Sequence, residues 1–257
     1  SATCDDGTPS FNLSDGVVIH EYGHAFCNPC MKACWPQIAD VAESSYKFVT
    51  SELQAQAYHT ASSMMYETLV RAWECMYIKL NAGNDDDGTD LLCKLHRERL
   101  SFPLVEDVFN GLCEYQARRD LYPDLMSYMP MMAERINKLK PDSVINSFME
   151  RCPEMSVEGI ADGDTAVAPG KKEIKLCFSI PHKYGCGING GRNDPEGNEI
   201  PDITSQRFES GNTGNMIFEI DLKPDTKYSM SFPGMFYLTK DYYPCRNTVF
   251  LDFKTRK

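Results

Sequence analysis

Two histidines four positions apart, with a glutamate directly after the first, form the segment of clearest chemical meaning: His20-Glu21-Tyr22-Gly23-His24. Residues four apart lie on the same face of an α-helix, so His20 and His24 can direct their imidazoles at one metal ion. Glu21 then lies beside the metal, where its carboxylate can take a proton from a zinc-activated water molecule and pass it to a leaving amine. The motif therefore indicates the hydrolytic centre of a zinc peptidase, with two histidine ligands and Glu21 as general base.

The residues around the motif favour a partly buried helix. Val17-Val18-Ile19 precede the first histidine and Ala25-Phe26 follow the second, which gives an apolar face at helical spacing, and Ser14 or Asp15 can cap the helix. Three fixed residues occur by chance in on the order of one chain in a hundred, so this context matters. A surface helix with incidental histidines is the alternative, and it is disfavoured because two of only five histidines fall here. The other three, which we interpret as structural, are His59, His96 and His182.

The first part of the chain is expected to be helical. From Gly16 to about Phe148 apolar residues recur at helical spacing, for example at Leu69, Val70 and Trp73, which predicts about five or six helices. Helix boundaries are predicted where turn-forming residues occur: at Pro29, at Pro36 as a first helical position, at 81–88, at Pro103, at Pro123 and at 141–143.

The composition changes after Pro153, where glycine, proline, asparagine and aspartate separate short alternating runs. Four such runs are predicted strands: 173–178, 216–220, 227–232 and 248–253. Short strands at this spacing fit an antiparallel sandwich of immunoglobulin type. We therefore expect a multi-domain α+β protein with a mainly helical domain at 1–152 and a β-sandwich at 153–257, the boundary falling near 152–157.

The charge of the chain excludes some partners. A formal net charge of -11 repels nucleic acids and anionic membrane surfaces. No uninterrupted apolar run is long enough to span a membrane, and no signal peptide is visible at the N-terminus. Three consecutive aspartates, 85–87, are interpreted as a solvated loop, since they lack the ligand spacing and closing glutamate of a calcium loop.

Cysteine usage gives a weaker signal, because the 11 cysteines are odd in number and irregularly spaced. Cys27 and Cys30 have the two-residue gap of a zinc knuckle or redox pair, but no second such pair follows. Buried thiols, or a local disulfide that involves Cys34, are the favoured interpretations.

The zinc motif and four further segments form a recognisable series along the chain. The segments are 7–11, the motif continued through 25–29, 67–72, 119–123 and 221–228. In this order they resemble a largely uncharacterised family of gluzincin-like metallopeptidases from gut bacteroidete-type bacteria. The resemblance spans nearly the whole chain. It implies zinc (Zn2+) as the cofactor, a peptide or protein as the substrate, a zincin-like helical domain and an immunoglobulin-like C-terminal domain.

The third zinc ligand is open between two glutamates. Glu43 follows His24 by 19 positions, the short separation common among gluzincins. Glu67 begins a segment that resembles the family's ligand helix, and Arg71, one turn on, can pair with its carboxylate and orient it. The resemblance favours Glu67, supported by Arg71, and leaves Glu43 as the rival. Two other glutamates are less favoured candidates: Glu52 and Glu74.

Peptidases of this type place a β-sheet before the zinc helix, and the edge strand of that sheet aligns the substrate backbone. Only 19 residues precede His20, so we expect the chain to be the C-terminal part of a longer precursor or an engineered fragment. The resemblance also implies an exported protein, periplasmic or at the cell surface, whose signal lies outside this sequence.

Two functions compete at this point. The first is a zinc-dependent peptidase that cleaves peptide bonds with metal-activated water and Glu21 as general base. The second is a non-catalytic binding or adhesion module of the cell surface, built on a gluzincin scaffold. A sandwich domain supports either, because a fold alone does not determine chemistry. The intact set of His20, Glu21 and His24 favours the peptidase, since a lapsed enzyme is free to lose the glutamate.

Overall fold

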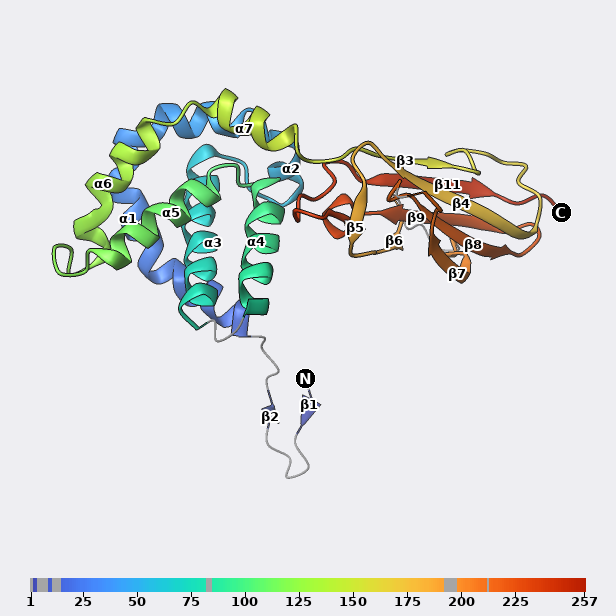
Figure 1. Cartoon of the computed structure of the whole chain (residues 1–257), viewed down its shortest axis with the longest axis horizontal. Coiled ribbons are helices and arrows are strands. Elements are labelled where there is room, and N and C mark those ends of the chain that lie inside the picture. Colours follow the sequence, from blue (N-terminus) through green and yellow to red (C-terminus); the bar gives the residue numbers. More distant parts are fainter. Residues whose placement is uncertain (1, 4–8, 11–14, 82–84, 192–197, 212) are drawn as a thin grey trace. The chain divides into compact units, whose positions relative to one another are not determined.

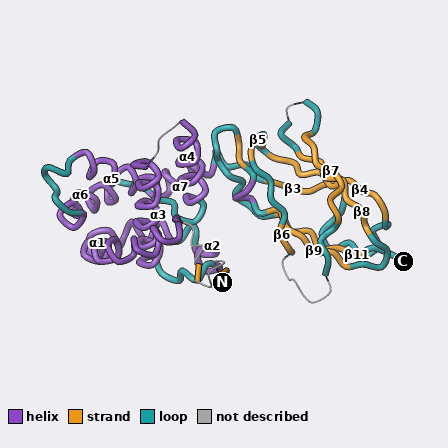
Figure 2. Tube along the Cα trace, turned by 90° about the horizontal axis from the view of Figure 1, so that it is seen from below, coloured by secondary structure: helices purple, strands orange, loops and turns teal. Residues whose placement is uncertain are grey.

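The protein consists of a helical unit followed by a unit of β-strands (Figure 1). The computed structural model describes residues 2–3, 9–10, 15–81, 85–191, 198–211 and 213–257. The chain divides into two compact units, 1–145 and 146–257, and the division falls inside the last helix rather than at position 152. Figure 2 shows the same separation by colour. The predicted mixed α+β architecture is confirmed.

The first unit opens with a short antiparallel pair, β1 (Ala2–Thr3) and β2 (Pro9–Ser10). Seven helices lie in the described residues, where five or six were predicted. They are α1 (Asp15–Tyr46), α2 (Thr50–Ala55), α3 (Ala61–Asn81), α4 (Asp85–Arg99), α5 (Val105–Ala117), α6 (Leu125–Asn137) and α7 (Pro141–Met149), the last of which crosses the division.

Helix α1 continues through both of its prolines, so the predicted breaks at Pro29 and Pro36 are wrong. A proline inside a helix deprives the carbonyl four residues earlier of its hydrogen-bond donor. Here those carbonyls belong to Ala25 and Lys32, and both residues are exposed. Water can therefore replace the missing bonds, because the prolines lie on the outer face of the helix.

The buried face of α1 differs from the predicted one. Val17 and Phe26 are exposed, so the expectation that they help to form an apolar buried face is wrong. The buried face is formed instead by Cys27, Met31, Cys34 and Ile38, which recur at helical spacing and pack in the core of the unit. The predicted cap, Ser14 or the side chain of Asp15, lies outside the described residues.

The other predicted boundaries agree better with the structure. Helices end before and begin after Pro103 and Pro123, and Pro141 is the first residue of α7. The aspartates at 85–87 are not in a loop, because α4 begins at Asp85 and includes them in its first turn. Acidic residues are favoured there by the helix macrodipole, although the side chains of these three lie outside the description.

Helix α3 is the centre of the helical unit. It packs against α1, α4 and α5, and α1 also packs against α6. Its apolar residues Met64, Met65, Leu69 and Val70 are fully buried. In Figure 1, α3 runs beside α4, and α1 lies on the other side of α3. Because α3 has neighbours on several sides, two of its polar residues, Glu67 and Thr68, are buried as well.

No described helix is both long and apolar enough to cross a membrane.

The second unit is built from antiparallel strands. Its four-stranded sheet has the order β3 (Met155–Glu158), β4 (Gly170–Phe178), β8 (Met216–Leu222), β7 (Asp202–Phe208). Its three-stranded sheet has the order β11 (Val249–Lys254), β9 (Lys227–Phe232), β6 (Asn189–Gly190). A third pairing joins β10 (Leu238–Thr239) to β5 (His182–Tyr184), and a short 3-10 helix spans Gly234–Phe236. Three of the four predicted strands lie within β4, β8 and β9, and the fourth, predicted at 248–253, overlaps β11 but starts one residue before it.

The two larger sheets share one apolar core. Ile174 and Phe218 from the first sheet and Phe232 and Leu251 from the second are fully buried in the same cluster. The rings of Phe218 and Phe232 lie 5.7 Å apart, which joins the facing sheets directly. His182 is buried in this unit, stacked 4.9 Å from the ring of Phe178, in agreement with a structural role.

Because the sandwich has its own core, we predict that residues 146–257 fold alone. The isolated segment should give a cooperative thermal transition and a β-type circular dichroism spectrum. It should also bind no zinc, since the candidate metal residues all precede it. An unfolded segment, or one that binds zinc through His182, would contradict this division.

Candidate metal site

The metal motif lies on α1 where that helix makes close contact with α3. Gly23, between the two histidines, is buried against this neighbour. A Cβ atom on Gly23 would lie 3.3 Å from Val70 Cγ1 and 3.6 Å from Trp73 Cδ1. Glycine therefore lets the two backbones approach closely at this point. The histidines on either side are brought within reach of polar groups on α3.

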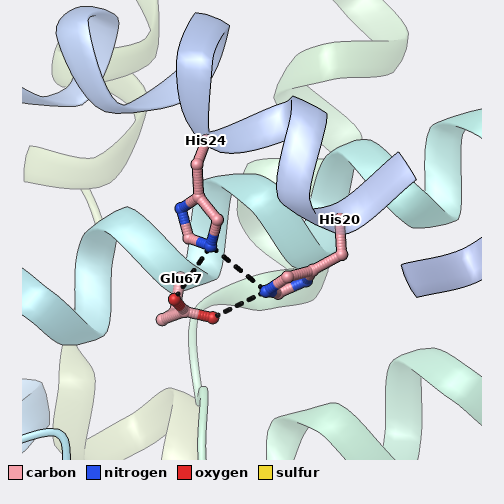
Figure 3. A group of neighbouring side chains, drawn as sticks. All are labelled: His20, His24 and Glu67. Atoms are coloured by element: carbon pink, nitrogen blue, oxygen red, sulfur yellow. Dashed lines mark hydrogen bonds and ion pairs between the residues drawn. The ribbon is translucent and has the colours of Figure 1, made fainter. Parts of the chain in front are cut away.

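Three side chains converge at this contact: His20, His24 and Glu67 (Figure 3). The Nε2 atoms of the two imidazoles are 3.2 Å apart. Glu67 Oε2 lies 3.5 Å from Nε2 of His20, and Glu67 Oε1 lies 3.3 Å from Nε2 of His24. Each carboxylate oxygen thus faces one imidazole. Among the described residues this is the only group of three or more side chains that can hold a metal ion.

These separations fit a divalent metal ion. Zinc is bound tetrahedrally with ligand distances of about 2.0–2.1 Å, which places neighbouring ligand atoms roughly 3.3–3.4 Å apart. The separation of 3.2 Å between the two Nε2 atoms lies close to that value, and each oxygen of Glu67 lies 3.3 or 3.5 Å from the imidazole that it faces. Two imidazole nitrogens and a carboxylate are also a donor set that zinc accepts. The residues therefore fit a divalent metal ion, zinc among them.

The outer nitrogens of both imidazoles have oxygen partners. Nδ1 of His20 lies 3.4 Å from Oε2 of Glu74, and Nδ1 of His24 lies 3.3 Å from Oδ1 of Asn28. A carboxylate and an amide oxygen accept hydrogen bonds, so an imidazole that donates to each of them through Nδ1 leaves its Nε2 lone pair turned toward the cluster. In that tautomer the two Nε2 lone pairs face each other at 3.2 Å, and a metal ion between them would stabilise the arrangement.

Glu67 is held in a buried and charged setting. Its side chain is 9% exposed, and its Oε2 has no hydrogen-bond partner among the described residues. An unsatisfied buried carboxylate oxygen is costly, which makes a bound cation favourable there. The guanidinium of Arg71 lies 3.8 Å from this oxygen on the next turn of α3. Arg71 therefore reduces, without removing, the cost of burying the carboxylate.

Arg71 is itself fixed by two other contacts. It donates to Oε2 of Glu98 at 2.7 Å, and its guanidinium stacks over the ring of Phe102 at 4.3 Å. Burial lowers its pKa, but the charges of Glu98 and Glu67 more than offset this, so the pKa is raised and the guanidinium stays charged. Tyr58 borders the same group, and its pKa is raised by burial and by the charge of Glu67. The predicted pairing of Arg71 with Glu67 is present in the structure.

The glutamates considered as the third metal ligand, and Glu21, lie in different parts of the helical unit. Glu67 lies with the histidines, whereas Glu43 is exposed further along α1 and Glu52 is exposed on α2. Glu74 contacts the outer nitrogen of His20 and is not one of the three converging residues. Glu21 is exposed and, at 100° per residue, lies on the stripe of α1 next to the two histidines. Glu21 thus borders the site from the solvent side.

Sequence reasoning missed Asn28 and considered Glu74 only as a metal ligand, not as a partner of His20. Asn28 is four positions after His24, and Glu74 is seven positions after Glu67, so both spacings mark a common helix face. Those spacings are the signals that could have found them. Lys94 and Glu98 of α4 have no such signal, because they depend on how α4 packs against α3.

The clustered cysteines of α1 are buried thiols rather than a second site. Cys27, Cys30 and Cys34 are all free and buried, as are most of the other described cysteines. Burial, reinforced by the neighbouring Cys30, raises the pKa of Cys27 to about 12, and burial raises that of Cys34 to about 11. Thiols with such pKa values resist ionisation, and ionisation is needed for metal binding or redox chemistry. The favoured prediction of buried thiols is confirmed, and Cys34 forms no disulfide.

Comparison with protein-family models, with curated proteins and with solved structures found no match to this chain.

The rival ligands can be separated by substitution. Glu67→Ala should weaken zinc binding by more than the 10–100-fold typical of residues that only support a ligand, because it removes a metal-binding oxygen. Glu43→Ala should leave the affinity unchanged, because Glu43 is exposed away from the cluster. Competition with a chromophoric chelator measures both affinities. A collapse in Glu43→Ala beside wild-type affinity in Glu67→Ala would reverse the assignment.

Proposed function

We propose that this chain carries a zinc-dependent peptidase site of gluzincin type. The observation that supports it is the convergence of His20, His24 and Glu67 at separations suited to one tetrahedral ion. A zinc ion held there would polarise a water molecule and lower its pKa to about 7. Related parts of the proposal are an immunoglobulin-like identity for the sandwich and an exported location, periplasmic or at the cell surface.

The openness of the site favours a catalytic over a structural metal. Structural zinc sites are closed by four protein ligands, whereas catalytic sites have three and leave a position for water or substrate. Only three side chains converge in the described part of the chain. The side chains of His20 and His24 are 19% and 25% exposed, so one side of the cluster faces solvent. A substrate can approach from that side.

Glu21 is the group that would move protons. It borders the two histidines on the exposed side of α1, the side from which water and substrate arrive. Its carboxylate would accept a proton from the attacking water and deliver it to the nitrogen of the leaving amine. With these transfers, the water oxygen would bond to the carbonyl carbon and the C–N bond would break, releasing a carboxylate and an amine. A peptide or protein is therefore the proposed substrate.

The first test of this proposed function is the metal content of the protein. Purified protein, dialysed after zinc supplementation, should contain about one zinc per chain, because the cluster provides one set of three ligands. Elemental analysis measures this ratio. The variant with both His20→Ala and His24→Ala should hold none. A folded wild-type sample without zinc would refute the proposal.

The second test of this proposed function is a substitution of the general base. Glu21→Gln should keep its zinc and lose peptide hydrolysis by about two to four orders of magnitude, because the amide cannot accept the proton. Hydrolysis of a fluorogenic peptide library, measured beside zinc content, tests this. Equal cleavage by wild type and Glu21→Gln would show that the base is wrongly assigned. Zinc binding without any cleavage by wild type would instead favour the binding or adhesion module.

A further inference from the structure

A circuit of charged side chains borders the metal cluster and closes through His20. Two of its members come from α4, a helix that carries none of the three metal-facing residues. The circuit, which we term the charge ring, consists of Glu67, Arg71 and Glu74 from α3 and Lys94 and Glu98 from α4. It meets the cluster twice. Glu67 is a metal-facing residue at one end, and Glu74 contacts the outer nitrogen of His20 at the other.

Lys94 connects the two halves of the charge ring. Its ammonium lies 3.6 Å from Oε2 of Glu74 and 3.3 Å from Oε1 of Glu98. The other oxygen of Glu98 accepts from Arg71 at 2.7 Å, and Arg71 faces Glu67. Arg71, Lys94 and Glu98 thus each have opposite charges on two sides, whereas Glu67 and Glu74 each face one cation of the ring and His20. Helix α4 supplies the residues that complete it.

The ring is buried enough for its contacts to matter. The side chains of Glu74 and Glu98 are 12% and 17% exposed, and that of Lys94 is 27% exposed. Partly buried charges are costly when a partner is lost, so removing one member should disturb its neighbours. Three carboxylates and two cations leave one net negative charge beside the site. That sign favours a bound cation.

The geometry points to Glu74 as a positioning residue for the ligand His20, held in place by Lys94. This inference rests on the proposed metal site. By accepting from Nδ1 of His20, Glu74 fixes the tautomer with Nε2 unprotonated and holds the ring plane toward the metal position. His24 has only the neutral amide of Asn28 in the equivalent place. Of the two histidines, only His20 therefore has a carboxylate as the partner of its Nδ1.

The test compares zinc affinity in full-length variants by chelator competition. Glu74→Ala should weaken zinc binding about 10–100-fold, the usual effect of losing such a support. Glu74→Gln should lose less, because its amide oxygen still accepts from Nδ1. Lys94→Met should also weaken binding, although Lys94 contacts no metal ligand, and Lys94→Arg should restore most of the affinity. Glu43→Gln is the control, since it removes one exposed negative charge from α1.

A spectroscopic readout separates positioning from general destabilisation. With Co2+ in place of zinc, the visible absorption bands report ligand geometry, and they should change in Glu74→Ala and Lys94→Met but not in Glu43→Gln. Unchanged affinity and unchanged Co2+ spectra in both ring variants would overturn the inference. If Glu74→Ala does not fold, Lys94→Met decides by the same criterion. A wild-type protein that binds no zinc would instead overturn the proposed function, and this inference with it.

Discussion

The contact between α1 and α3 is the constraint on which the candidate site depends. The two histidines come from one turn of α1, but a metal site needs a further ligand that only a second helix can supply. α3 brings Glu67 within 3.5 Å of both imidazoles, and the contact is close because Gly23 has no side chain. The buried thiols and apolar residues further along α1 hold the same face in the core. The rest of the helical unit keeps these two helices in register.

Local parts of the site were predictable, and long-range parts were not. His20 and His24 follow from helical periodicity alone, because four positions bring side chains to one face. Glu67 was favoured through similarity to a family segment rather than through spacing. Glu74 lies 54 positions from His20, so its contact with that histidine depends on how α3 packs against α1. Helical spacing places Glu74 on the same face of α3 as Glu67, but it does not tell which residue of α1 that face contacts.

The fold shows the same division between local and long-range information. Alternating apolar residues located the main strands, and proline located the helix boundaries at Pro103, Pro123 and Pro141. The same rule failed in α1, because the cost of a proline depends on whether water reaches the carbonyl that it leaves unpaired. Ala25 and Lys32 are exposed because of how the helices of the unit pack, and the local sequence does not predict that packing.

The close approach at Gly23 has a consequence for recognising related sites. In a motif defined by two histidines and a glutamate, the two positions between Glu21 and His24 count as free. Here one of them faces Val70 and Trp73, and any side chain would press against them. Glycine makes up about 7% of residues, so requiring it cuts accidental matches about fourteenfold. The five-residue pattern of His, Glu, any residue, Gly and His, with four fixed positions, therefore carries more information about this helix pairing than the metal-binding residues do by themselves.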